Sequence, residues 1–143
     1  MRVLKCEVYA RNKIKSSGID NISLDLMIGI PEQTTESLKN SIDFCIELEP
    51  KHISAYILKI EENTPFKRLA PTLNLPNEDA QADFYEYMQD CLSKNGFEQY
   101  EISNFAQAGY ESRHNIKYWQ CDEYLGLGPS AHSMMNSKRF YFP

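Results

Sequence analysis

A single carboxylate, Asp25, lies in the middle of an apolar segment that covers residues 22–28. Apolar and polar side chains alternate there with the period of a β-strand, Ile22, Leu24, Leu26 and Ile28 on one face and Ser23, Asp25 and Met27 on the other. Gly29 ends the strand, and Thr34 or Thr35 can cap a helix after it. A polar side chain near the carboxyl end of such a strand is how α/β barrels build active sites, although an aspartate with purely structural hydrogen bonds fits the pattern too.

The histidines are the other candidates for chemistry, and they lie in three different settings. His52 begins the apolar segment HISAYILKI, where we expect a structural role. His132 lies in the glycine-rich stretch GLGPSAHS, and we expect its side chain to point inward and to be hydrogen-bonded. His114 lies in the segment SRHNIKYW, and the residues alone favour a surface histidine beside a Trp119 that packs in the core.

Composition limits the classes of function. The net charge of −5 argues against nucleic-acid binding, which favours a basic face. We expect no signal peptide, because the stretch over residues 1–5 is too short and too charged, and no membrane span, because no apolar run approaches about 20 residues. We therefore expect a cytoplasmic protein. The four cysteines form no CxxC pair, so the sequence predicts reduced thiols and no cluster or zinc site within this chain: Cys6, Cys45, Cys91 and Cys121.

The elements that must position these residues follow from periodicity and from turn residues. A strand over 19–28, a helix over 35–48 and a strand over 52–60 form a unit whose short connections predict a parallel pair with a right-handed crossover. Asn77 caps the best-defined helix, which Gly96 ends. The other segments are expected to be a helix over 2–17, an irregular connection over 61–76, a strand over 97–105, a short helix or loop over 110–120, a glycine-rich turn over 124–129, and one or two strands over 131–142.

Five segments, in this order, resemble one protein family: DLMIGIPEQT (25–34), HISAYILKIEENTPF (52–66), QYEISNFA (99–106), SRHNIKYW (112–119) and YLGLGPSAHS (124–133). They are similar to the radical-SAM proteins called oxygen-independent coproporphyrinogen III oxidase-like, and among these to the HemW-type heme chaperone branch. The resemblance implies an α/β fold. Residues 1–70 would be the end of a partial (β/α) radical-SAM barrel, a β-α-β unit. Residues 71–143 would be a following α+β segment that carries the HNxxYW motif and is incomplete at its C-terminus.

The sequence also departs from that family. The family's CxxxCxxC motif, which holds a 4Fe-4S cluster, and its glycine-rich strand for S-adenosylmethionine are both absent from this chain. We therefore expect a fragment, either engineered or from a truncated gene, that is catalytically inactive by itself. Two parallel strands leave an exposed apolar edge, so we expect a homodimer through that edge unless residues 97–142 cover it.

The resemblance implies roles for five residues. Asp25 corresponds to a position that contacts S-adenosylmethionine, Tyr56 to an aromatic residue near the adenine, and Lys59 to a position whose backbone contacts the same ring. His114 corresponds to a proposed ligand of heme iron, and Trp119 would pack on the porphyrin.

Three functions are compatible with these residues. The first is a heme chaperone that binds heme and S-adenosylmethionine and passes heme to an acceptor protein. The second is oxidative decarboxylation of coproporphyrinogen III to protoporphyrinogen IX, against which the HNIKYW segment argues. The third is a structural module that binds nothing.

Overall fold

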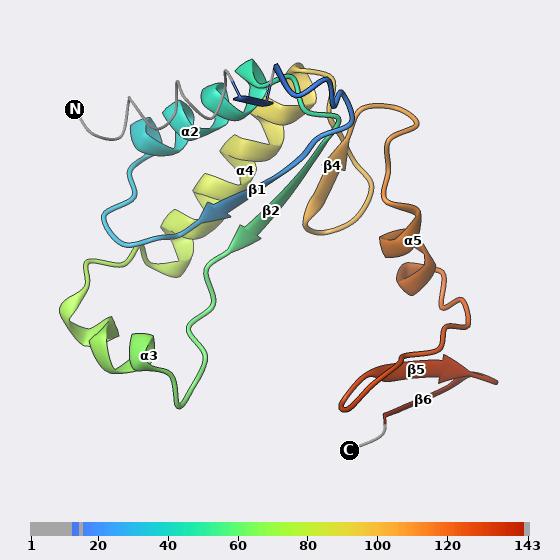
Figure 1. The fold of residues 1–143 in the computed structure, drawn as a ribbon. Helices are drawn as coiled ribbons and strands as arrows, with labels where there is room; N and C mark the ends of the chain where they lie inside the picture. The colour runs from blue at the N-terminus through green and yellow to red at the C-terminus, as the bar shows by residue number, and fades with distance from the viewer. Residues whose placement is uncertain (1–12, 15, 142–143) are drawn as a thin grey trace. The chain divides into compact units, whose positions relative to one another are not determined.

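The computed structural model describes residues 13, 14 and 16–141. Its elements, shown in Figure 1, are β1 (Ser23–Ile28), α2 (Thr35–Glu47), β2 (His52–Ile57), α3 (Pro65–Leu69), the short 3-10 helix η1 (Ala70–Thr72), α4 (Glu78–Lys94), β3 (Glu98–Gln99), β4 (Asn104–Ala106), α5 (Arg113–Trp119), β5 (His132–Met135) and β6 (Lys138–Tyr141). Most of the helix predicted over 2–17, with Cys6, lies outside the described residues. No helix in the described part of the chain has both the length and the apolarity needed to cross a bilayer.

The contacts divide the chain into two compact units, one up to Tyr110 and one from Glu111 onward. Helix α4, which follows the boundary predicted at residue 70, packs on α2 and β1 within the first unit. Residues 71–110 therefore belong with the sheet by their contacts. The division at residue 70 into a barrel end and a following segment stays a prediction.

The first unit contains a four-stranded sheet with the order β1-β2-β4-β3. Strands β1 and β2 are parallel, with Ser23 opposite His52 and Ile28 opposite Ile57, which confirms the predicted parallel pair. Strand β4 adds to the other side of β2 in the antiparallel direction, and β3 pairs with β4. Among the described residues, β1 pairs with β2 alone and is therefore an edge strand.

One face of this sheet is covered by α2 and α4, and the core lies between them (Figure 1). The alternation predicted for β1 is confirmed, because Leu26 and Ile28 are buried while Asp25 is exposed. Burying a large apolar side chain contributes roughly 1.5–3 kcal/mol, so this layer stabilises the packing of the helices on the sheet. The core residues are Leu26, Ile28, Leu38, Ile42, Cys45, Ile53, Ala55, Phe84, Met88, Leu92, Phe97 and Phe105.

Helix caps fix where α2 and α4 begin. Thr34, rather than Thr35, caps α2: its Oγ1 accepts from the Ser37 N–H at 3.1 Å, and Ser37 Oγ accepts from the Thr34 N–H at 2.9 Å. Asn77 Oδ1 accepts from the Ala80 N–H at 2.9 Å at the start of α4, as predicted. These side chains satisfy N–H groups that have no partner within the helix.

Two segments differ from the predictions. Residues 61–76 are not wholly irregular, because Thr64 caps α3 and Pro65 occupies its first position, where a fixed φ favours helix. The single strand predicted over 97–105 is instead the short pair β3 and β4. The turn between them is held by the Glu101 carboxylate, which accepts from the Ser103 N–H at 3.0 Å and from the Asn104 amide.

The second unit consists of α5 and the β5–β6 hairpin. Asn136 and Ser137 have φ values of 51° and 59°, as the two central residues of a type I′ turn require. The segment over 131–142, predicted as one or two strands, therefore forms two strands. The glycine-rich stretch pairs with β5, since Tyr124 and Met134 exchange N–H···O bonds of 2.9 Å in both directions. Gly126 is needed there because a Cβ at that position would lie 2.2 Å from the His132 carbonyl oxygen.

Candidate functional site

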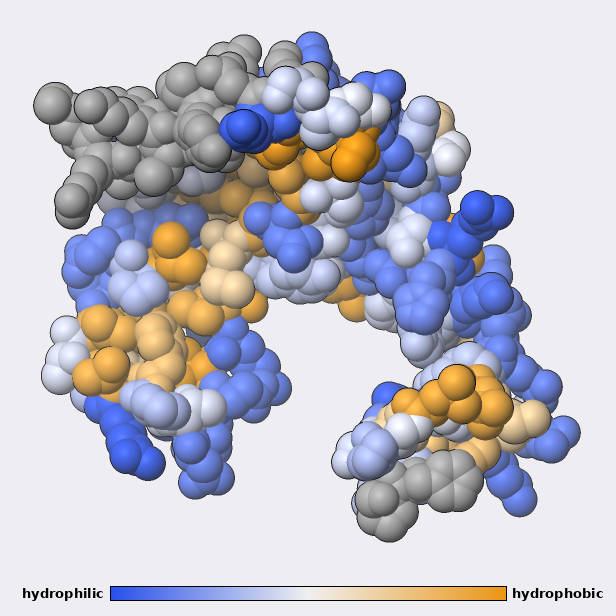
Figure 2. Space-filling view, viewed as in Figure 1, coloured by the Kyte–Doolittle hydropathy of each residue, from blue (hydrophilic) through white to orange (hydrophobic). Residues whose placement is uncertain are grey.

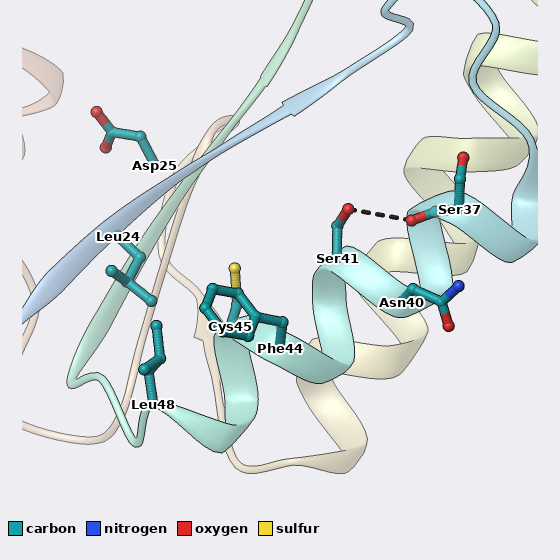
Figure 3. A pocket seen from close by; sticks show the side chains of 8 residues that line it. All are labelled: Leu24, Asp25, Ser37, Asn40, Ser41, Phe44, Cys45 and Leu48. Carbon is teal, nitrogen blue, oxygen red and sulfur yellow. Dashed lines mark hydrogen bonds between the residues drawn. The ribbon is translucent and has the colours of Figure 1, made fainter. Parts of the chain in front are cut away.

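Asp25 and Tyr56 lie on the same face of the sheet, the one opposite to α2 and α4. The parallel register places Asp25 beside Ser54 and Met27 beside Tyr56. Asp25 is exposed and Tyr56 is 43% exposed, so both side chains are accessible. Figure 3 shows Asp25 projecting from β1 away from the α2 side chains. This face can therefore offer a carboxylate and an aromatic ring to one ligand.

Lys59 lies beyond the end of β2. Its Nζ forms an ion pair of 2.9 Å with Glu61, and both side chains are largely exposed. Exposed pairs of this kind contribute about 0–1 kcal/mol, so the ion pair does not fix the local backbone. The predicted role of Lys59 concerns its backbone groups, which this side-chain contact leaves unchanged.

A cavity of about 440 Å³ lies between β1 and α2, and Figure 3 shows the side chains around it. Apart from Asp25, which points away, none of the residues predicted for ligand binding lines it. Its walls are Leu24, Ser37, Asn40, Ser41, Phe44, Cys45 and Leu48. We assign no ligand to this cavity.

His52 is buried at the centre of a hydrogen-bonded group that the sequence did not reveal. Its Nδ1 lies 2.8 Å from Ser23 Oγ, and its Nε2 lies 2.7 Å from the Tyr100 hydroxyl. Burial lowers the pKa of His52 below its ordinary value of 6.5, while the Asp25 and Glu101 carboxylates act in the opposite direction. His52 is therefore neutral at pH 7 and links β1, β2 and the β3–β4 turn, which is the structural role predicted for it.

The lowered pKa of His52 predicts a pH dependence of stability. The unfolded chain binds more protons at this site than the folded chain below 6.5, so the stabilisation is complete above 6.5 and is lost as the pH falls below it. Urea unfolding at about pH 7.5 and about pH 5.5 should show a larger loss of stability in the wild type than in His52→Gln. Equal losses in the two proteins would contradict this prediction, since the other titrating groups are the same.

Asn104 has a buried carbonyl oxygen without a hydrogen-bond partner among the described residues. Its amide nitrogen donates to Glu101, and this charge fixes the orientation of the amide. Asn104 is only 5% exposed, so it is not part of a solvated strand face.

His114 is exposed on α5, and a row of aromatic rings begins at it. The His114 and Tyr118 rings lie 5.0 Å apart, edge to face, as residues one helical turn apart can. The Tyr118 and Tyr124 rings lie 4.7 Å apart in the same arrangement. Trp119 is 56% exposed, so the interpretation with Trp119 in the core is wrong: α5 has seven residues and buries none of them.

The prediction for His132 is wrong. His132 is exposed and its ring lies 5.2 Å from the Tyr141 ring, while Ser133 is fully buried and its Oγ accepts from the Gly126 N–H at 2.9 Å. Neighbouring residues in a strand point to opposite faces, so a register one residue away from the predicted one exchanges the two side chains.

The three cysteines in the described part of the chain do not fit an iron–sulfur cluster. Cys45 is buried on α2, where burial raises the pKa of its thiol, Cys91 is half-buried on α4, and Cys121 is exposed after α5. Within the described residues, no three His, Cys, Asp or Glu side chains come together as a metal site. The described residues therefore do not form a cluster site.

Comparison of sequences finds heme chaperones named HemW. The protein of Lactococcus lactis subsp. lactis is 41% identical over 130 residues, 90% of this chain and 34% of the relative. Those of Bacillus subtilis and Haemophilus influenzae are 41% and 42% identical, over 89% and 88% of this chain and 34% and 32% of the relatives. The chain belongs to the HemW-like family. It spans about a third of the length of the curated relatives that it matches.

Comparison of structures identifies the fold of this HemW-like chain. The coproporphyrinogen III oxidase HemN of Escherichia coli, a radical SAM enzyme, matches with a TM-score of 0.66 and 19% sequence identity. The match covers 90% of this chain and 33% of the enzyme. The chain thus has the α/β fold of part of a radical SAM enzyme, as predicted. No family model matches the sequence.

Proposed function

We propose that this chain is part of a cytoplasmic heme chaperone and that its second unit binds heme through His114. The observation that carries the proposal is the exposure of His114 on α5 at one end of the row formed with Tyr118 and Tyr124. A neutral imidazole is a common axial ligand of heme iron, and aromatic rings pack against flat conjugated ligands. Relatives at 34–42% identity named as heme chaperones support the same function.

The surface of the second unit supports an apolar ligand. Hydrophobic side chains gather over the segment that contains the β5–β6 hairpin (Figure 2), and Leu125 and Leu127 are exposed next to it in the sequence. Trp119 is exposed as well. Exposed apolar side chains that lie together often mark a binding surface, and a porphyrin would cover such side chains on binding.

On the first unit we propose a contact surface for S-adenosylmethionine. The exposed Asp25 carboxylate can accept hydrogen bonds from ribose hydroxyls, and Tyr56 on the same face can lie against the adenine. Backbone groups at Lys59 complete the proposed surface. The exposed carboxylate and the accessible aromatic ring fit the ribose and the adenine of this ligand. When bound, the ligand would supply a sulfonium group.

Transfer of heme, rather than oxidation of a porphyrinogen, is the activity we propose for the whole protein. The chaperone relatives share 34–42% of their aligned residues with this chain, whereas the likeness to the oxidase, at 19% identity, concerns the fold alone. A heme-acceptor protein is the partner that transfer requires. A second copy of the chain paired along β1 is a further proposed partner, because β1 is an edge strand within the described residues.

A heme titration of the full chain tests the proposal. We expect a saturable shift of the Soret band in the wild type and affinity lower by about tenfold or more in His114→Ala, because the iron loses its ligand. His132→Ala is the matched control, since it removes an exposed histidine of the same unit that lies outside the motif. The proposal fails if the wild type shows no saturable shift, or if the two variants bind heme equally well.

A further inference from the structure

A second pocket lies entirely within the second unit. Its volume is about 440 Å³, and its walls come from the end of α5, from the glycine-rich stretch and from both strands of the hairpin. The lining residues are Tyr118, Cys121, Tyr124, Met134 and Arg139. Of these, only Tyr118 belongs to the HNxxYW motif, and no sequence pattern connects the others to it.

The strand register explains why three of these side chains lie in one row. Met134 is directly opposite Arg139 in the β5–β6 hairpin, and Tyr124 pairs with Met134 from the other side. Directly opposite residues project to the same face of a sheet. Tyr124, Met134 and Arg139 therefore form one side of the pocket, and the row ends at a guanidinium group.

The pocket is continuous with the proposed iron ligand. Tyr118 lines it and also contacts the His114 ring, and the Tyr118 ring meets the Tyr124 ring at 4.7 Å. The Tyr118 and Tyr124 rings and the polarisable thioether of Met134 form an apolar wall against which a flat conjugated ligand can pack. Moving along this wall from His114 leads to Arg139.

Arg139 has a positive charge for which the described part of the chain offers no ion-pair partner. No ion pair or hydrogen bond of its guanidinium group is found among the described residues. The Glu123 carboxylate accepts from the Asn136 N–H at 2.6 Å in the hairpin turn. A guanidinium group at the end of an apolar wall suits a carboxylate carried on an apolar body.

From this geometry we infer that the pocket beside α5 binds the propionate edge of heme and that Arg139 pairs with a propionate carboxylate. The inference rests on the proposed heme function and adds a residue that sets the orientation of the macrocycle. With iron near His114 and a propionate at Arg139, the ring would lie along Tyr118 and Tyr124. Arg139 is a positioning and specificity residue in this arrangement, because it selects a ligand with a free carboxylate.

Titrations of the full chain with hemin and with hemin dimethyl ester, in which both propionates are esterified, test the inference. We expect Arg139→Gln to weaken hemin binding by about five- to tenfold and to leave binding of the ester unchanged, because the ester offers no carboxylate. Lys138→Gln removes an adjacent charge that points to the other face of the hairpin, and it should change neither affinity. Arg139→Lys retains the charge and should recover part of the hemin affinity.

The outcomes separate this inference from the proposed function. If hemin binds and His114→Ala weakens it, while Arg139→Gln has no effect or weakens hemin and ester equally, the pairing with propionate is wrong and the heme function stands. If the wild type binds neither compound saturably, both are wrong. Far-ultraviolet circular dichroism of each variant establishes that it is folded, and Arg139→Met, which also lacks the charge, replaces Arg139→Gln in the comparison if Arg139→Gln does not fold.

Discussion

Replacing Phe105 by alanine is expected to lower the free energy of unfolding of the first unit by about 3–5 kcal/mol, the usual cost of removing a buried aromatic ring. Phe105 is 1% exposed and lies in β4, which has only three residues. So short a strand has few ladder hydrogen bonds, and the side chain must anchor it in the core. Loss of the ring would also free the side of β2 that β4 covers.

Urea unfolding followed by circular dichroism measures this effect. Ile102→Ala is the control, since Ile102 is 64% exposed in the adjacent turn and its truncation should cost less than about 0.5 kcal/mol. A loss below about 1 kcal/mol in Phe105→Ala would show that β4 does not depend on this side chain.

Gly126→Ala is expected to destabilise the second unit by about 2–3 kcal/mol, because the new methyl group would meet backbone atoms that no rotamer change can move. Its Cβ would lie 2.2 Å from the carbonyl oxygen of His132 and 2.9 Å from the carbonyl carbon. Relief requires the glycine-rich stretch to separate from β5, which breaks the bond between the Gly126 N–H and Ser133 Oγ. Units of fewer than about 40 residues seldom have stability to spare, so unfolding of this unit is the expected result.

Trp119 is the single tryptophan of the chain and lies in the second unit, so its fluorescence reports on that unit alone. We expect Gly126→Ala to shift the midpoint of the fluorescence transition to a lower urea concentration. The unfolding transition of the first unit, followed by circular dichroism, should keep its midpoint. Leu127→Ala serves as the control because that side chain is 85% exposed. Equal stability of the two variants would mean that the stretch can move away from β5 at little cost.

The sequence predicted the elements whose signals are local. The bounds of α4 were predicted almost to the residue from the cap Asn77 and from the apolar residues spaced along one face. Alternation in β1 correctly placed Leu26 and Ile28 on the buried face and Asp25 on the other. The β3–β4 turn was not predicted, because the alternation of apolar and polar residues continues through it. Only the hydrogen bond from the Ser103 N–H to the Glu101 carboxylate indicates the turn. The short helix α3 was not predicted, because three prolines in and near it indicated an irregular segment.

The candidate sites were predictable in part. The residues named from the motifs, Asp25, Tyr56 and His114, are accessible, as a ligand contact requires. The group around His52 joins residues 29 and 48 positions away in sequence, and spacing along the chain contains no signal for such contacts. The proposed role of Arg139 has no such signal either, because its place opposite Met134 depends on the register of a hairpin.

Among the described residues β1 is an edge strand, and this position gives Asp25 a second role. The strand SLDLMI has one charged side chain among six residues, and apolar edge strands of this length can template cross-β aggregation. Asp25 acts there as a gatekeeper charge, since repulsion between stacked carboxylates opposes growth of an aggregate. Asp25→Asn would remove the gatekeeper together with the proposed ligand contact, and lost solubility would then imitate lost binding. Asp25→Glu preserves the charge while it moves the carboxylate, so it is the substitution that can examine ligand binding without promoting aggregation.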